Sequence, residues 1–361
     1  MNNKQLGFTL IELMISLTLG LIVVASAILL FLTGQRSVAM QQGVAELQDN
    51  ANFGLNYMTK DIRLTNLNTK TAAISDQTLY GGVVLTSNAS VDVVTNTTVI
   101  PNEKKPTLPT TIVVNSTLLS QSSGRPGVTV GTSPQWTGAS NVEDSSGTAL
   151  TSDQLVIQYL PQYTIDTKST PTDETDDEYV GGFDCEGNEI RYSKSAGLRM
   201  YVQRYFLRVD GNSVSTELPP LALACDAGYY PINAPTTISN YGTTAGGSEI
   251  IMKRVDHFRV LLGVQKDIAA AASTPASTTY QYVSIKDYMA MTAPRPRILS
   301  IQLGVLVRST QSVGAESAVR ADQQFQVLDQ TVKVKPPSNP KYIRQVVSQT
   351  IALRNALGER E

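Results

Sequence analysis

One carboxylate lies where an ionised group is costly: Glu12 directly precedes an uninterrupted apolar run and follows Phe8 by four residues. A charge inside lipid is unfavourable unless it is paired. A cut between Gly7 and Phe8 would give Phe8 a free amine, a positive charge at a helix start, one turn from Glu12 or on a neighbouring molecule. The alternative is a carboxylate that merely extends to the membrane surface. If such a cut occurs, pairing with the new amine would turn the unfavourable charge of Glu12 into a docking interaction.

Two cysteines and one histidine limit the possible chemistry. Cys185 and Cys225 lie forty positions apart in polar sequence, far beyond the N-terminal apolar segment. This placement suits one disulfide made in an oxidising compartment. The alternative is two unpaired small buried residues, since the sequence does not show whether their α-carbons approach each other. With so few His and Cys residues, we expect no metal cage and no cofactor.

Catalysis is also not expected. The histidine, His257, stands in a predicted strand between Asp256 and Phe258, where a histidine is most often a packed or surface residue. The sequence contains no G-x-S-x-G nucleophile elbow and no phosphate-binding glycine pattern. We therefore predict that the chain is not an enzyme and has no catalytic residues.

An acidic run could be a cation site or a solvated loop. Its carboxylates are those of Asp173, Glu174, Asp176, Asp177 and Glu178, and Asp184 follows after two glycines. Calcium accepts flexible carboxylate-rich loops, but the run lacks EF-hand spacing. We predict a solvated loop and keep calcium as the alternative. Lysine plus arginine number 29 against 31 acidic residues, a net charge of −2, so no basic field predicts direct nucleic-acid binding.

A single long helix is predicted to carry Glu12. Leu13 to Leu32 contain no charge, and about twenty apolar residues suffice to cross a bilayer. An apolar stripe at spacings of three and four then predicts an amphipathic continuation to about Asn66, through Met40, Val44, Leu47, Ala51, Leu55, Met58 and Ile62. A helix from Phe8 to Asn66 would be roughly 90 Å long. Gly34 and Gly43 are its expected weak points.

The remainder is predicted to be an antiparallel β head, which makes the chain α+β. Residues 67–151 are rich in Ser, Thr, Asn, Val and Gly and predict irregular β structure, with pieces such as Gly82–Leu85. In Arg297–Val307, the apolar residues from Leu299 onward fall on one face. Asp210-Gly211 predicts a hairpin turn after Val209. Five strands are expected, at Leu155–Leu160, Arg199–Val209, Val255–Val264, Arg297–Val307 and Tyr342–Leu353.

The string GFTLIELMISL from Gly7 to Leu17 resembles the prepilin peptidase motif of type IV pilins and type II secretion pseudopilins. The resemblance implies cleavage after Gly7 by a membrane aspartyl peptidase, N-methylation of Phe8, and Glu12 as the fifth residue of the mature chain. The segments Leu47–Asn66 and Tyr342–Asn355, and more loosely Val255–Asp267, resemble PilW-like minor pilins.

For that family, the resemblance implies a structural subunit that primes pilus assembly at the pilus tip and supports twitching motility, adhesion or DNA uptake. Its implied partners are other minor pilins, the major pilin, a tip adhesin, the prepilin peptidase and the inner-membrane assembly platform. The implied location is the inner membrane, in one span with a periplasmic head, before incorporation into the pilus. The alternatives are a J-type minor pseudopilin of type II secretion and a surface adhesin or enzyme that keeps its membrane anchor.

The expected organisation has five parts. Residues 1–7 form a leader, 8–33 the membrane and filament-core part of the helix, and 34–66 its amphipathic part. Residues 67–151 form a variable region, and residues 152–361 form the antiparallel head.

Overall fold

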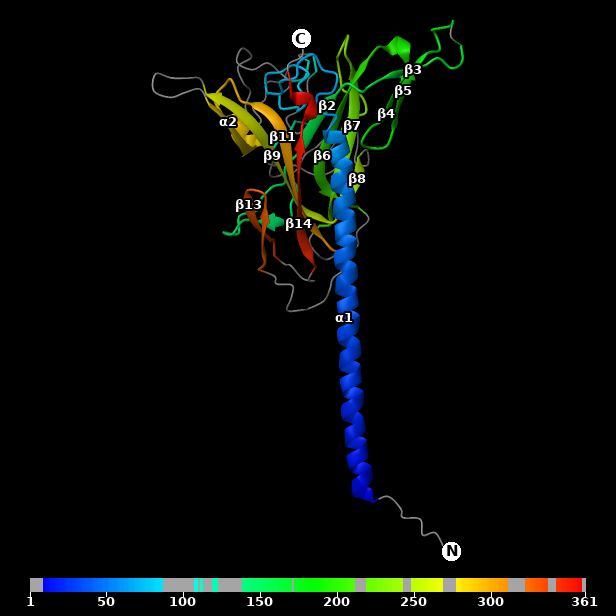
Figure 1. The fold of residues 1–361 in the computed structure, drawn as a ribbon, viewed down its shortest axis with the longest axis vertical. Helices are drawn as coiled ribbons and strands as arrows, with labels where there is room; N and C mark the ends of the chain where they lie inside the picture. Colours follow the sequence, from blue (N-terminus) through cyan, green and yellow to red (C-terminus); the bar gives the residue numbers. More distant parts are fainter. Residues whose placement is uncertain are drawn as a thin grey trace.

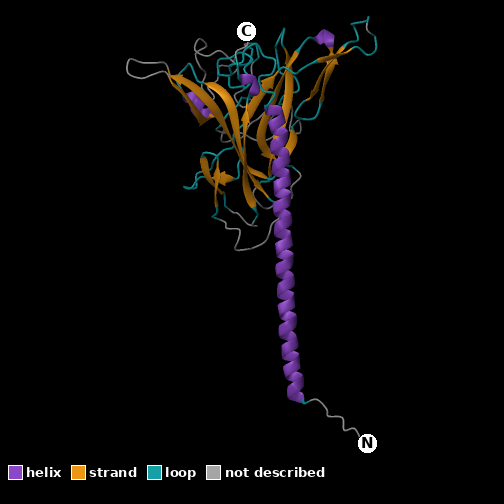
Figure 2. Ribbon diagram, viewed as in Figure 1, coloured by secondary structure: helices purple, strands orange, loops and turns teal. Residues whose placement is uncertain are grey.

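A long helix projects from a β-rich head (Figure 1). The computed structural model describes residues 9–86, 107–109, 111–112, 119–122, 138–170, 172–211, 219–242, 248–268, 277–310, 322–336 and 342–358. The helix, α1, runs unbroken from Leu10 to Ile62 through Gly34 and Gly43. Its first half stands clear of the head, and its last turns pack one face against the strands (Figure 2). The predicted fold class, α+β with a long N-terminal helix on an antiparallel head, is confirmed.

The helix ends four residues before the predicted boundary. Asn66 is fully buried in a left-handed conformation, with φ of 63°, and asparagine is one of the few residues that adopt it readily. Its side-chain amide donates to the carbonyl oxygens of Thr71 and Ala72, and its side-chain oxygen accepts from the amide of Gly82. The buried asparagine thus turns the chain after Ile62.

The head contains strands that all follow the helix in sequence. The first seven described strands are β1 (Val142–Glu143), β2 (Leu155–Tyr159), β3 (Thr164–Asp166), β4 (Glu178–Phe183), β5 (Glu189–Ser193), β6 (Arg199–Val209) and β7 (Leu221–Pro231). The others are β8 (Glu249–Lys253), β9 (Val255–Ile268), β10 (Ser277–Ser284), β11 (Arg297–Arg308), β12 (Gln324–Val327), β13 (Gln330–Val334) and β14 (Arg344–Ala352). A short helix, α2, spans Ile285–Ala290, and 3-10 turns span Lys194–Ala196 and Arg354–Ala356.

Antiparallel pairing builds four sheets from the described strands, where the sequence predicted one. Two have four strands, in the orders β2-β6-β7-β8 and β10-β9-β11-β14. Two have three strands, in the orders β3-β4-β5 and β1-β13-β12. The predicted turn at Asp210 does lie between two paired strands, since β6 pairs with β7 and the Asp210 amide donates to the carbonyl of Pro220. The connection is longer than the two-residue turn predicted.

All five predicted strands form, but one predicted face is wrong at its start. A β-bulge interrupts the pairing of β11 with β9 between Ile298 and Ser300. The extra residue shifts the alternation, so that Ile298 is buried and Leu299 is only half-buried. From Ile301 to Val307 the predicted alternate residues are buried. Leu306, on the opposite face, is buried as well, because the β1-β13-β12 sheet packs there.

The predicted Gly82–Leu85 strand is a single bridge beside β2. Val83 pairs with Ile157, and Val84 donates to the carbonyl of Val156. Much of 67–151 lies outside the described residues.

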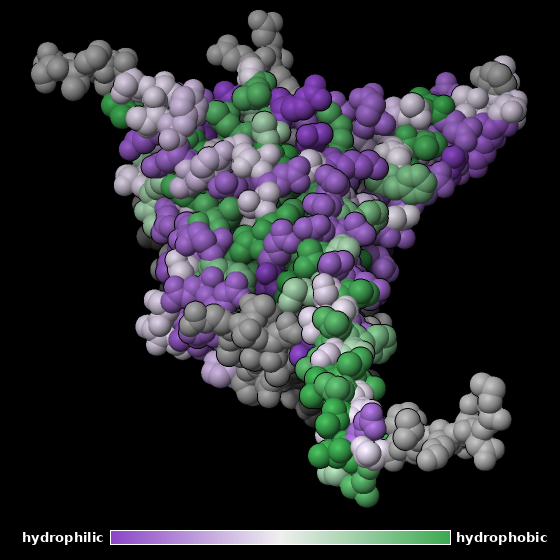
Figure 3. Space-filling view, turned by 60° about the horizontal axis from the view of Figure 1, so that its bottom comes forward, coloured by the Kyte–Doolittle hydropathy of each residue, from purple (hydrophilic) through white to green (hydrophobic). Residues whose placement is uncertain are grey.

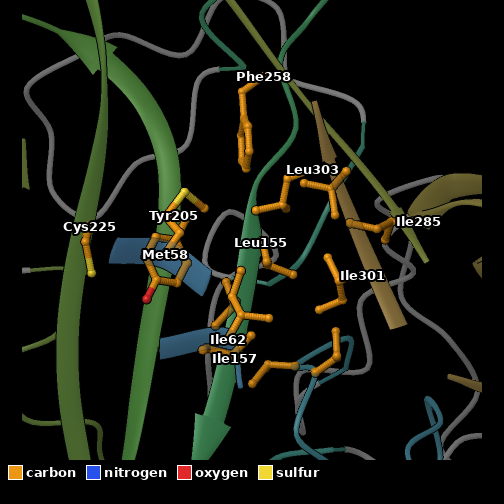
Figure 4. Close-up of a cluster of buried hydrophobic side chains, with 14 of the residues drawn as sticks. Met58, Ile62, Leu155, Ile157, Tyr205, Cys225, Phe258, Ile285, Ile301 and Leu303 are labelled. Carbon is orange, nitrogen blue, oxygen red and sulfur yellow. The ribbon is translucent and has the colours of Figure 1, made fainter. Parts of the chain in front are cut away.

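The core forms where the helix meets both four-stranded sheets. α1 contacts β8 at the edge of one and β14 at the edge of the other. Of the predicted stripe, the five residues from Leu47 to Ile62 are buried, while Met40 and Val44 are half-buried. Met58 and Ile62 join a cluster that includes Leu155, Tyr205 and Ile301 (Figure 4). The helix therefore fills the seam between two sheets, which fixes its direction relative to the head.

Candidate functional site

The free half of α1 presents a continuous apolar surface. From Leu10 to Leu32, the large apolar side chains are 43–78% exposed, and no charged residue lies between Glu12 and Arg36. The segment is long and apolar enough to cross a membrane, and none of its most apolar window is buried in the molecule. Apolar side chains cover the projecting end of the helix (Figure 3). An exposed apolar surface of this size marks a site that lipid or another protein covers.

The hydroxyl groups on this surface are already satisfied. Ser16, Ser26 and Thr33 donate to the carbonyl oxygens of Glu12, Ile22 and Leu29, at 2.9, 2.8 and 2.8 Å. Because these bonds stay inside the helix, the hydroxyls need no water. The polar residues of the segment are therefore compatible with an apolar environment.

Glu12 takes part in a capping box at the helix start. The hydroxyl of Thr9 accepts from the Glu12 amide at 3.3 Å, and the Glu12 carboxylate accepts from the Thr9 amide at 3.4 Å. The sequence analysis did not identify Thr9, although Thr-x-x-Glu before an apolar run is the signature of this motif. Gly7 and Phe8, the predicted cleavage and methylation residues, lie outside the described residues. The box holds the Glu12 carboxylate at the first turn, facing the start of the chain.

Side-chain hydrogen bonds fix the second half of the helix to the head. The amide of Asn50 donates to the carbonyl oxygen of Lys253 at 2.7 Å, and its oxygen accepts from the Lys253 amide at 3.2 Å. Further along, Tyr57 donates to the carbonyl of Cys185 at 3.1 Å. At the helix end, the Tyr205 hydroxyl donates to Asp61 at 3.1 Å, and burial raises the pKa of Asp61 to about 6. These bonds attach α1 firmly to the head.

The predicted disulfide between Cys185 and Cys225 is confirmed. It joins the turn after β4 to the middle of β7, with α-carbons 6.1 Å apart, and both residues are buried. The three-stranded β3-β4-β5 sheet is thus covalently fixed to the larger β2-β6-β7-β8 sheet. Together with the Tyr57 bond, the disulfide also ties this small sheet to α1.

Most carboxylates of the acidic run form ion pairs or hydrogen bonds with nearby side chains. Glu178 pairs with Lys168 and Arg191, and Asp177 pairs with Lys194, which also contacts Glu174. Asp173 and Asp176 accept from threonine hydroxyls, and Asp184 accepts from the amides of its own turn. Among the described residues, no group of three or more His, Cys, Asp and Glu side chains is arranged to hold a metal ion.

His257 lies in the core and is fully buried in β9. Its Nε2 lies 2.9 Å from the Gln330 side-chain oxygen, and its Nδ1 lies 3.1 and 3.3 Å from the hydroxyls of Ser140 and Ser152. Burial lowers the pKa of His257 to about 4, with Arg259 and Lys335 adding to the effect. The residue connects β9 to the β1-β13-β12 sheet and has no access to a substrate.

Comparisons with known proteins match both ends of the molecule. The family model described as type IV pilus-assembly protein W matches residues 231–355, which include β8 to β14. The model of the prokaryotic N-terminal methylation motif matches residues 2–28. The predicted resemblance to PilW-like pilins is confirmed by these matches.

Among solved structures, a type IV-like pilin from Thermus thermophilus is 13% identical, with coverage of 60% of this chain and 84% of that one. The TM-score is 0.24, at which the likeness carries no weight for the fold. No curated protein matches the chain.

Proposed function

We propose that this membrane-anchored, PilW-like pilin is a minor pilin of a type IV pilus, a structural subunit that primes assembly and occupies the pilus tip complex. One observation carries the proposal: an apolar half-helix projects from a rigidly attached head, with Glu12 as the carboxylate at its start. A subunit built in this way can move from lipid into a filament without refolding, because both environments cover the same surface.

The apolar surface suits two successive environments, the membrane before assembly and the filament after it. Before assembly, Leu13 to Leu32 would span the inner membrane, with the head in the periplasm, where the Cys185–Cys225 disulfide is favoured. After assembly, the same side chains would pack against the helices of other minor pilins and the major pilin. The buried residues of α1 begin at Leu47, so the head would stay outside the filament core.

Glu12 supplies the docking group in this proposal. In the present chain, its carboxylate accepts weakly from Thr9, at 3.3 and 3.4 Å. Cleavage after Gly7 would make Phe8 the first residue, and methylation keeps the positive charge of its amine. That charge, in the same or a neighbouring subunit, is a much stronger partner for a carboxylate in an apolar environment than a hydroxyl. Pairing would therefore fix the position of one subunit's helix along the helix of its neighbour.

The decisive experiment replaces Glu12 in cells. Glu12→Ala and Glu12→Gln should be processed and inserted into the membrane, yet be lost from sheared filaments, and pilus number should fall. Asp49→Ala is the matched control, because Asp49 is an exposed carboxylate later in the same helix. Normal piliation in both Glu12 variants would contradict the proposal and favour an adhesin that keeps its anchor.

Mass spectrometry of the mature chain tests the processing step separately. We expect the stable form to begin at Phe8 with one added methyl group, in the wild type and in Glu12→Ala alike. Recovery of the subunit with pili and not with secretion-system pseudopili would separate the minor pilin from the J-type pseudopilin alternative. A stable form that retains residues 1–7 would contradict both.

A further inference from the structure

A cavity of about 280 Å³ lies between the β3-β4-β5 sheet and strand β7. Its walls include Asp184 and Glu189 from the small sheet side, and Arg199, Tyr201, Tyr229 and Asn240 from the larger sheet and the loop after β7. Ligand pockets in proteins commonly measure about 300–1,000 Å³. The cavity therefore has room for one small group, such as a single ring with its substituents.

The Arg199 side chain on this wall packs against two tyrosine rings. Its guanidinium carbon lies 3.8 Å from the ring centre of Tyr192 and 4.3 Å from that of Tyr229. Its backbone is also held, because the Arg199 amide donates to the Tyr192 hydroxyl and its carbonyl accepts from Tyr163. A stacked guanidinium keeps its in-plane N–H groups available for a carboxylate. Within the described residues, the Arg199 side chain makes no hydrogen bond or ion pair.

Three further polar groups on the cavity wall have no hydrogen-bond partner in the described part of the chain. They are the hydroxyls of Tyr201 and Tyr229 and the side-chain amide of Asn240. Burial raises the pKa of Tyr201, so its hydroxyl stays protonated and can donate. Arg199 and these three groups therefore face the cavity with their hydrogen-bonding capacity open to a ligand or to water.

The position of Asn240 is set by close backbone packing. A side chain at Gly228 would meet the Tyr241 β-carbon at 2.5 Å and the Ser239 carbonyl at 2.6 Å. Glycine therefore lets the loop lie directly on β7, where Tyr229 and Ser239 exchange two backbone hydrogen bonds. Asn240 follows in a left-handed conformation, with φ of 60°. The cavity wall is thus a defined part of the fold.

The remaining charges on the wall are already neutralised or engaged. Arg191 pairs with Asp166, Glu178 and Glu189 at 2.7 to 3.1 Å. Asp184 accepts from the amides of Glu186 and Asn188 and from the Asn188 side chain. Among the described lining residues, Arg199 is then the one charged side chain that has neither an ion pair nor a hydrogen bond. A matching ligand carries one negative charge, together with several groups that can both donate and accept hydrogen bonds.

We propose that this cavity binds one acidic sugar unit of the uronic acid type. Its carboxylate would lie on the Arg199 guanidinium, and its hydroxyls would contact Asn240, Tyr201 and Tyr229. Asp184 and Glu189 would accept from the hydroxyl groups. The site lies outside the helix and is separate from any role in filament assembly, so it would give a finished subunit a function of its own: attachment to acidic polysaccharide.

A peptide carboxylate is the competing ligand. An aspartate or glutamate side chain could reach Arg199, but its carboxylate would bring no hydrogen-bond donors for Asp184 and Glu189. A sugar offers hydroxyl donors to these carboxylates. Acetate, which has a carboxylate and no hydroxyl group, separates the two cases.

The test is ligand binding to the full-length protein in detergent micelles. Saturation-transfer NMR would be recorded with D-glucuronate, D-glucose and acetate, and the dissociation constants would be measured by titration. We expect glucuronate to bind at least about tenfold more tightly than glucose or acetate. Arg199→Gln should weaken glucuronate binding by at least about tenfold, and Asn240→Ala or Tyr201→Phe by several-fold. Arg354→Gln, at an exposed site in the C-terminal turn, should leave binding unchanged.

Three outcomes would overturn the inference: no glucuronate binding, equal binding by Arg199→Gln, or acetate binding as tight as glucuronate. Tyr201→Phe removes only a hydroxyl, so it reports on the site even if Arg199→Gln fails to fold. Because binding is measured on purified protein, failure here would leave the proposed pilin function untouched. Conversely, normal piliation in the Glu12 variants would leave the sugar site untouched.

Discussion

Asn66 and Asn355 hold each other across the end of the helix. The side-chain amide of Asn66 donates to the carbonyl oxygen of Asn355 at 3.1 Å. The side-chain amide of Asn355 donates to the carbonyl oxygens of Arg63 and Thr65, both at 3.1 Å. Carbonyls at a helix end lack partners inside the helix. Asn355, from the C-terminal part of the chain, therefore acts as a cap on these carbonyls.

Asn355→Ala is expected to loosen this cap. Loss of two hydrogen bonds to helix-end carbonyls should lower the free energy of unfolding by about 1–2 kcal/mol. Urea unfolding of the full-length protein in detergent would measure the change. The matched control is Asn56→Ala, an exposed asparagine on α1, for which we expect less than about 0.5 kcal/mol. Equal effects of the two changes would show that the cap contributes nothing specific.

Two glycines in the same helix should respond in opposite ways to alanine. A β-carbon at Gly54 would meet the Met252 side chain at 2.6 to 3.3 Å, whereas nothing lies within 4 Å of one at Gly34. Gly54→Ala should lower stability by about 1–3 kcal/mol through overpacking. Gly34→Ala should be neutral or slightly stabilising, because alanine favours a helix. Thermal unfolding would compare the two. A stable Gly54→Ala protein would mean that the helix can move away from β8.

The disulfide should make a large contribution to stability. It closes a loop of 40 residues, for which the chain-entropy model gives about 4 kcal/mol. Reductant should lower the unfolding midpoint of the wild type to that of the Cys185→Ala, Cys225→Ala double variant. The double variant itself should not respond to reductant. A wild-type midpoint that is insensitive to complete reduction would contradict this expectation.

The buried histidine should make the head sensitive to acid. The pKa of His257 falls from an ordinary 6.5 to about 4 in the folded chain, so the unfolded state takes up the proton first. The stability contributed by neutral His257 is complete above pH 6.5 and is lost as pH falls toward 4, by up to about 3 kcal/mol. The stability difference between wild type and His257→Gln, from urea unfolding at pH 7, 6 and 5, should shrink accordingly. A constant difference would show that another group governs the acid response.

The parts of the molecule that follow a local periodicity could be predicted from sequence. Spacings of three and four residues located the apolar stripe from Leu47 to Ile62, and alternation located β11. The two cysteines indicated their own partnership because the chain has no others. Each of these signals depends on neighbouring residues or on composition.

Features created by distant residues could not be predicted in this way. The bulge at Leu299 arises from pairing with β9, and the second buried face of β11 arises from a sheet that packs over Leu306. Asn50, Asn66 and Asn355 are polar residues whose roles depend on contacts about 200 or more positions away. Thr9 is different, since its capping signature is local and readable from the sequence.

The cap on Arg63 and Thr65 has a consequence for how the protein is made. In chain order, α1 is translated first, and β14 and Asn355 are translated after every other strand of the head. The anchor can therefore enter the bilayer while the ribosome is still producing the residues that must close over it. A nascent chain that terminates before residue 344 would lack both the strand beside the helix and the cap on its end. Such a product would be anchored in the membrane with part of its core exposed to proteases. Translation through Asn355 is therefore needed to close the head around the end of the helix.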